Sequence, residues 1–124
     1  MKKVLIDTSV WIEFLKGNKE IFDPMMDLME NGEIYTLELI FAELMQGVRS
    51  AREHSIITEF YQQMRVLDQP GLIFQAGEYS RKEKLLSKGI GLIDAVLIYS
   101  AQNFGIELWT LDKKIQGYLS DKLI

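Results

Sequence analysis

The chain has 124 residues, of which 48% are hydrophobic and 26% are charged. These proportions are typical of a globular protein, so they exclude a disordered, collagen-like or coiled-coil chain. The absence of cysteine excludes a disulfide framework and a zinc–thiolate site, and the single histidine excludes a centre built from several histidines. The length predicts one domain over residues 1–124.

The net charge is −4, from 18 acidic and 14 basic residues, which taken alone argues against a nucleic-acid partner. If four acidic residues gather in one site, however, the remaining charges balance. Asp7 and Glu13 interrupt the apolar N-terminus too early for a signal peptide. No segment approaches the roughly 18 apolar residues of a membrane span. We therefore expect a cytoplasmic protein with no membrane contact.

Strand and helix patterns alternate along the chain. Apolar and β-branched runs predict strands, and between them lie periodic segments that predict helices. Such alternation favours an α/β fold with a mainly parallel sheet of four to five strands. In chain order the predicted elements are a strand at 3–6, a helix through 10–15 capped by Thr8 or Ser9, a methionine-rich helix ending at 31–32, a strand at 33–37, helices at 40–48 and 51–64, a strand at 65–67, helices at 70–87 and 92–104, a strand at 107–111 and a helix at 113–118.

Two acidic residues follow predicted strands. Asp7 ends the first strand, and Asp112 follows the fourth. Ligands of parallel sheets bind beyond the carboxyl ends of the strands, so both carboxylates are expected at that edge. Each residue also suits the cap of the helix that follows it, which is an alternative explanation for both.

Two further acidic residues lie on predicted helices. Asp94 shares a helical stripe with Leu97, Ile98 and Ala101, which are apolar and should face the core. A carboxylate on such a stripe is uncommon unless it has a partner, although a first-turn position also favours an anion. Glu43 lies in the middle of its helix, where it could simply border an apolar face.

The four carboxylates are more informative together than singly. At about 5 Å and an effective dielectric near 20, each like-charged pair repels by roughly 3 kcal/mol. Such a cluster needs protons or a cation, and an all-oxygen ligand set suits Mg²⁺ or Mn²⁺. These ions support phosphodiester hydrolysis by activating water, which requires neither histidine nor cysteine.

The sequence resembles PIN-domain ribonucleases, and within them the VapC toxins of toxin–antitoxin pairs. The resemblance covers nearly the whole chain in order and spacing. It implies a three-layer α/β/α fold around a mainly parallel sheet. The matching segments are Val4–Ile12, Ala42-Glu43-Leu44 with Gly47, Ile93–Ile98 with Ala101 and Gly105, and Leu108–Asp112.

The resemblance also implies a site and its chemistry. Its metal ligands and catalytic residues would be the four acids Asp7, Glu43, Asp94 and Asp112. The implied activity is Mg²⁺- or Mn²⁺-dependent endonuclease cleavage of RNA. The hydroxyl residues Ser9 and Thr110 match positions that support the acids. The implied partners are the RNA substrate, an antitoxin chain and a second copy of this chain.

One departure from the family pattern follows the fourth acid. An aromatic residue is often found shortly after that position, whereas this chain has Lys113-Lys114-Ile115. The two lysines can reach the RNA backbone, where contacts position a substrate without reading its sequence. The alternative is that both lysines are simply exposed to solvent.

The sequence leaves three alternative functions. A catalytically silent PIN-fold module that binds RNA or protein would keep the fold without cleavage. A dehalogenase-like phosphoryl-transfer protein built on Asp7 usually needs a second aspartate two residues later, where this chain has Ser9. A receiver-type signalling domain needs an acidic pair near the first strand, and here Asp7 is followed by Thr8.

Overall fold

A computed structural model describes residues 1–122. Its centre is a four-stranded sheet in the order β3-β2-β1-β4, with every strand pair parallel. Val4 lies opposite Ile34 on one side and Glu107 on the other. The sheet confirms the α/β prediction. The strands are β1 (Lys3–Ile6), β2 (Glu33–Thr36), β3 (Arg65–Val66) and β4 (Glu107–Trp109).

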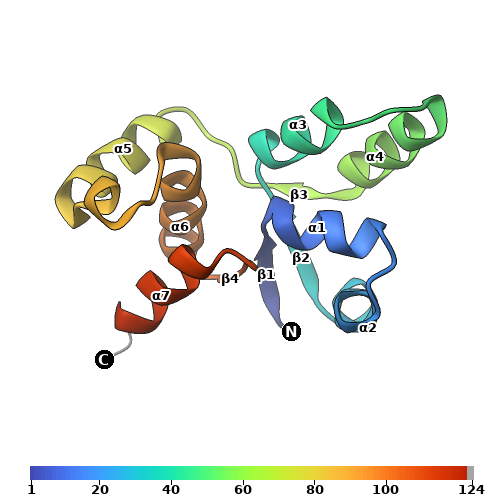
Figure 1. Cartoon of the computed structure of the whole chain (residues 1–124), viewed down its shortest axis with the longest axis horizontal. Coiled ribbons are helices and arrows are strands. Elements are labelled where there is room, and N and C mark those ends of the chain that lie inside the picture. Colours follow the sequence, from blue (N-terminus) through green and yellow to red (C-terminus); the bar gives the residue numbers. More distant parts are fainter. Residues whose placement is uncertain (123–124) are drawn as a thin grey trace.

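Helices cover both sides of the sheet (Figure 1). The first two helices lie on one side and the last three on the other, which gives the expected layered arrangement. Within residues 1–122 no helix has the length and apolar character needed to cross a membrane. The helices are α1 (Thr8–Leu15), α2 (Lys19–Asn31), α3 (Glu38–Gln46), α4 (Ala51–Gln63), α5 (Leu72–Glu83), α6 (Leu92–Phe104) and α7 (Lys113–Lys122), with a short 3-10 helix, η1 (Leu85–Lys88).

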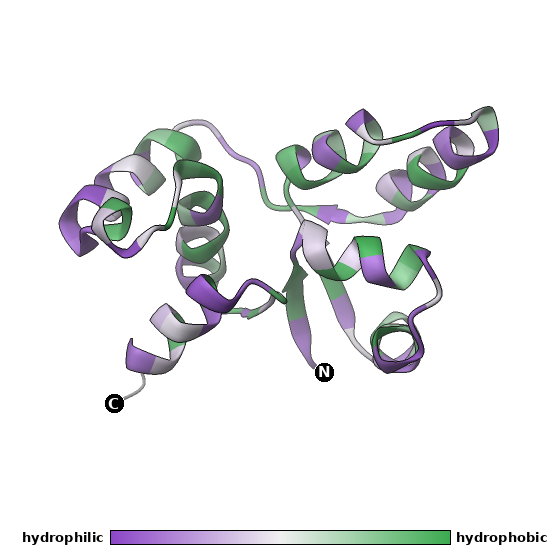
Figure 2. Ribbon diagram, in the orientation of Figure 1, coloured by the Kyte–Doolittle hydropathy of each residue, from purple (hydrophilic) through white to green (hydrophobic). Residues whose placement is uncertain are grey.

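The hydrophobic core has two parts. The larger part surrounds β1, whose residues Val4–Ile6 are almost fully buried, and includes the aromatic side chain of Trp11. The smaller part joins α6 to α7 and η1, and contains Ile98 and Ile115. Figure 2 shows the apolar residues of β1 and α6 at the centre and polar residues on the outer helices. The predicted apolar stripe of α6 therefore does face the core.

The N-cap of the first helix lies one residue before the earlier of its two predicted positions. Asp7 is the N-cap of α1, and its side chain accepts a hydrogen bond from the Thr8 amide. The prediction that Thr8 or Ser9 caps this helix was therefore wrong. Both residues already lie inside the helix, because the short side chain of Asp7 satisfies a free amide of the first turn immediately after the strand.

The long helix predicted over residues 70–87 is broken in two. Helix α5 ends at Glu83, and Lys84 adopts a left-handed conformation with φ 57° and ψ 42°. The 3-10 helix η1 follows at once. The helical pattern continues across the break, so the change of direction is set by the packing of Leu85 into the smaller core.

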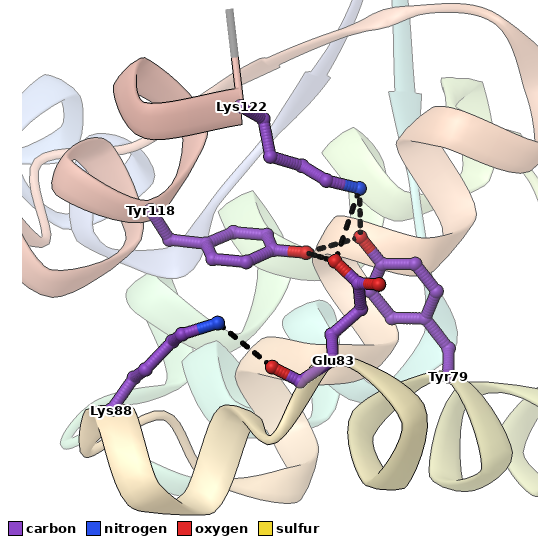
Figure 3. A network of polar contacts seen from close by, with 5 residues as sticks. All are labelled: Tyr79, Glu83, Lys88, Tyr118 and Lys122. Atoms are coloured by element: carbon purple, nitrogen blue, oxygen red, sulfur yellow. Dashed lines mark hydrogen bonds and ion pairs between the residues drawn. The ribbon is translucent and has the colours of Figure 1, made fainter. Parts of the chain in front are cut away.

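A polar network ties the end of α5 to α7 (Figure 3). The Tyr118 hydroxyl donates to Glu83 at 2.8 Å and lies 2.6 Å from the Tyr79 hydroxyl. The Lys122 ammonium donates to the Tyr79 hydroxyl and forms an ion pair with Glu83. The Lys88 ammonium donates to the Glu83 carbonyl and lies 5.2 Å from the centre of the Tyr118 ring. The network therefore fixes the far end of α7.

Candidate functional site

The carboxyl ends of β1 and β4 bring two of the predicted acids to one edge of the sheet. The strands pair in parallel, with Ile6 opposite Trp109. The Asp7 amide extends this pairing by donating to the Trp109 carbonyl at 3.0 Å. Asp112 comes three residues after Trp109, at the start of α7. The sheet therefore places Asp7 and Asp112 at the edge where ligands of parallel sheets bind.

The Asp7 carboxylate is buried and held by three donors. Its exposed fraction is 7%. Oδ1 accepts from the Thr8 amide at 2.6 Å, whereas Oδ2 accepts from the Ser9 hydroxyl at 3.1 Å and from the Thr110 hydroxyl at 2.6 Å. Hydrogen bonds to an ionised carboxylate are stronger than those between neutral groups, so this side chain has a fixed orientation.

Asp112 caps α7 and is linked to Asp7 through one hydroxyl. Its Oδ1 accepts from the Lys114 amide at 2.8 Å and from the Ile115 amide at 3.0 Å. Its own amide donates to the Thr110 hydroxyl at 3.0 Å. Within residues 1–122 no hydrogen bond reaches Oδ2 of Asp112. That oxygen is therefore available to a ligand, while Oδ1 holds the helix.

Asp94 lies in the first turn of α6 and is half-buried. Its pKa is raised above the usual 3.8, first by burial and then by the negative charges of Asp112, Asp7 and Glu43. The Lys114 ammonium acts in the opposite direction. The charges of the other three predicted acids therefore reach Asp94, whose carboxyl holds its proton more tightly than usual.

Glu43 joins the group from α3. It is exposed, and its Oε1 accepts a hydrogen bond from the Thr8 hydroxyl at 2.9 Å. Beside it, a groove of about 560 Å³ runs between α1, α3 and α4. Its lining is mostly apolar and includes Ile12, Leu44 and Gly47. An open, partly apolar groove thus leads to the acidic group.

The donor set suits a hard divalent cation. Every group is a carboxylate, and Mg²⁺ and Mn²⁺ prefer oxygen ligands. The mutual repulsion that raises the pKa of Asp94 is relieved by a positive ion. Among residues 1–122, no three acidic, histidine or cysteine side chains lie close enough to hold one ion together. The residues fit such an ion by charge and chemistry, and closing around it requires the side chains to turn.

The six residues named from the sequence all lie in this region. The structure places Asp7 and Asp112 at the sheet edge, and it places Asp94 near enough to feel their charges and that of Glu43 on α3. Ser9 and Thr110 both donate to Asp7. Their roles in function stay predictions, since the structure shows only where they lie.

Sequence reasoning missed the part played by Thr8. This residue was considered only as a helix cap, whereas its hydroxyl contacts Glu43, which lies 35 positions later in the chain. The only signal available was a second hydroxyl residue directly after an acid that ends a strand. That pattern is equally typical of an ordinary helix start.

Comparison with known proteins places the chain in a family. The sequence-family model of the PIN domain matches residues 4–118 of this chain. Ribonuclease VapC32 of Mycobacterium tuberculosis, strain CDC 1551 / Oshkosh, is 29% identical over an alignment of 117 residues, and the alignment covers 92% of this chain and 88% of that protein. The protein of the same name from strain H37Rv matches with the same values.

Solved structures share the fold. VapBC-1 of nontypeable Haemophilus influenzae matches with a TM-score of 0.74 and 19% identity, over 96% of this chain and 93% of that chain. VapBC2 of Rickettsia felis, solved with a DNA fragment from its promoter, matches with a TM-score of 0.70 and 18% identity, over 92% of this chain and 91% of that chain. FitAcB of Neisseria gonorrhoeae matches with a TM-score of 0.63 and 20% identity, over 90% of this chain and 89% of that chain. With most of its length matched by the family model, the chain belongs to the PIN-domain family.

Proposed function

We propose that this chain is a divalent-metal-dependent endoribonuclease and the toxin of a toxin–antitoxin pair. The observation that carries the proposal is the gathering of four carboxylates from four different elements around the end of β1. Support also comes from the family and from a relative named as a ribonuclease. The geometry suits phosphodiester hydrolysis, because the substrate and the cluster are both anionic and need a cation between them.

In this proposal the four acids Asp7, Glu43, Asp94 and Asp112 hold Mg²⁺ or Mn²⁺. When bound, the ion supplies an activated water and neutralises charge on the phosphate. The protein contributes orientation. Thr110 and Ser9 fix the Asp7 carboxylate, and the start of α7 fixes one oxygen of Asp112.

Glu43 and Asp94 contribute differently. The Thr8 hydroxyl turns the otherwise exposed Glu43 toward the sheet edge. Asp94 lies half-buried in the first turn of α6, within reach of the charges of the other three acids. Asp94 would hold the ion in its ionised form, so protonation of this residue at low pH would compete with metal binding.

The structural comparison supports one of the three proposed partners. The solved structures of similar fold include VapBC assemblies, which supports an antitoxin chain as the partner of this one. RNA is the proposed substrate, and a second copy of the chain is the proposed dimer partner. The antitoxin would keep the nuclease inactive until it is removed.

A catalytically silent binding module is the second candidate. It is favoured by one observation: within residues 1–122 no three of the acids lie close enough to share an ion as they stand. In that case the acidic edge would serve only to bind RNA or protein. Cleavage assays with a matched variant separate the two candidates.

The test uses the purified chain, free of antitoxin, and total RNA with Mg²⁺ or Mn²⁺. Cut ends are mapped by sequencing, and Asp94→Asn and a chelator serve as controls. We expect discrete cuts that disappear in both controls. Thermal unfolding gives a readout independent of activity: a metal at about 100 times its Kd stabilises the folded state by roughly 2.7 kcal/mol. We expect this gain in the wild type and its loss in Asp94→Asn.

Three results would overturn the proposal or a part of it. A folded, antitoxin-free chain that cuts no RNA with either ion would favour the binding module. Full activity in Asp94→Asn would remove that residue from the site. Cuts that persist in the chelator would contradict the metal requirement.

A further inference from the structure

Lys114 is a cation placed beside the acidic group by the first turn of α7. Its amide donates to Oδ1 of Asp112 at 2.8 Å, so its backbone is fixed by the same residue that caps the helix. Its side chain extends toward the loop that precedes α6. Asp94 lies in the first turn of that helix. Lys114 therefore reaches from α7 to the loop that comes before the helix carrying Asp94.

A glycine makes room for this lysine. A Cβ at Gly89 would lie 3.2 Å from the Lys114 Nζ, 3.3 Å from its Cδ and 3.4 Å from its Cε. The lysine stem thus lies directly against the backbone of Gly89, which has a φ of +77°. A side chain at this position would crowd the ammonium group, so the glycine allows Lys114 to adopt its position.

Within residues 1–122 the Lys114 ammonium forms no ion pair with an acidic side chain. It acts on Asp94 against the three neighbouring carboxylates. Yet it takes part in none of the ion pairs formed within residues 1–122, which join Lys2 to Glu107, Lys16 to Glu13 and Lys122 to Glu83. An exposed ammonium near an acidic group, without an ion pair of its own, is free to bind an incoming anion.

We propose that Lys114 binds a phosphate of the RNA strand next to the one at the acidic group. This inference rests on the proposed function, since it names a contact that positions the same substrate. An ammonium binds a phosphate oxygen without reading the base, so Lys114 would contribute affinity and position but not sequence preference. The acidic group repels RNA, and Lys114 offsets that repulsion at its edge.

A purely structural role makes a different prediction. If Lys114 only balances the negative charges, removing it lowers the stability of the metal-free chain and leaves RNA affinity unchanged. If it binds phosphate, removing it weakens RNA binding and reduces the dependence of binding on salt. The number of ion pairs made with phosphates sets that dependence, at about 0.7 in the log–log slope for each contact with single-stranded RNA.

The experiment measures binding of a fluorescein-labelled single-stranded RNA of random sequence by fluorescence anisotropy over a series of salt concentrations. The Asp94→Asn background prevents cleavage during the measurement. The matched control is Lys113→Ala, which removes an equal charge from the preceding, exposed residue of α7. We expect Lys114→Ala to weaken binding about tenfold. We expect Lys113→Ala to change binding little and Lys114→Arg to restore most of the affinity.

Gly89→Ala provides a second, indirect test. The added methyl group should displace the Lys114 side chain and weaken RNA binding in the chain that retains the lysine. In the Lys114→Ala chain the same change should have no further effect on binding. This double-mutant comparison separates displacement of the lysine from local strain at a positive φ, because strain would appear in both chains.

Each outcome decides between the proposals. Equal affinity and equal salt slope for Lys114→Ala and its parent would overturn the inference, even where the wild type cuts RNA. Equal losses for the Lys113 and Lys114 variants would do so as well, since general charge would then explain the effect. A wild-type chain that cuts no RNA, but whose binding depends on Lys114, would overturn the nuclease proposal and support this contact.

Discussion

The Thr110 hydroxyl donates a hydrogen bond of 2.6 Å to Oδ2 of Asp7, and both side chains are buried. The same hydroxyl accepts a hydrogen bond from the Asp112 amide at 3.0 Å. One small side chain therefore links the acid that ends β1 to the acid that begins α7. The relative position of two of the four carboxylates depends on it.

We predict that Thr110→Val destabilises the chain and lowers any RNA cleavage. Valine keeps the shape of threonine but leaves a buried carboxylate without one donor, which costs about 1.5–3 kcal/mol for a bond to a charged group. Urea unfolding followed by circular dichroism measures this loss. Thr110→Ser keeps the hydroxyl and is the matched control. Equal stability of the valine variant and the wild type would show that the bond contributes nothing.

We predict that Asp94→Asn raises stability when no metal is present, and does so most at neutral pH. The pKa of Asp94 is raised in the folded chain by burial and by like charges, so the folded state binds this proton more tightly than the unfolded state. The corresponding stability is present below the usual pKa of 3.8 and is lost as the pH rises through the higher folded value. Asparagine cannot ionise and avoids that loss.

Thermal unfolding in a chelator, from acidic to neutral pH, checks this prediction. The gap between Asp94→Asn and the wild type should widen as the pH rises. Glu59→Gln removes an exposed carboxylate on α4 and serves as the control for the loss of one negative charge. A lower melting temperature for Asp94→Asn at neutral pH would contradict a repulsive acidic group.

The sequence was informative about the site where local pattern and chain direction were enough. An apolar strand followed by an acid placed Asp7 and Asp112 at one sheet edge, and helical periodicity placed Asp94 on the core side of α6. The contact of Thr8 with Glu43 and that of Lys114 with Gly89 could not be found this way. Both join residues of different elements, and their geometry depends on how those elements pack.

We predict that Tyr118→Phe loosens the attachment of α7 and lowers stability by about 1–3 kcal/mol, since it removes the bonds to Tyr79 and Glu83. The pKa of Tyr118 is raised by burial and then by those two neighbours, so the folded chain keeps the phenol neutral. Wild-type stability should therefore fall as the pH rises above the usual 10.0, whereas the variant lacks this loss.

Urea unfolding at neutral and alkaline pH measures both effects of Tyr118→Phe. The difference in free energy of unfolding between variant and wild type should shrink toward alkaline pH. Tyr99→Phe, which removes one hydrogen bond to Gln75, is the control and should show a smaller loss. A difference that stays constant with pH would show that ionisation of Tyr118 is not coupled to unfolding.

We predict that Lys84→Gly stabilises the chain by roughly 0.5–1 kcal/mol. Lys84 has a φ of 57° at the end of α5, a conformation that costs a residue with a Cβ roughly 1–2 kcal/mol and costs glycine little. The greater freedom of glycine in the unfolded chain offsets part of that gain.

Lys84→Ala removes the same charge but keeps the Cβ, so it should give no comparable increase. Lys82→Gly, inside α5, should instead destabilise by about 1 kcal/mol. Urea unfolding of the three variants tests whether the packing of Leu85 imposes a strained turn where α5 ends. A loss of stability in Lys84→Gly would show that the turn is not strained.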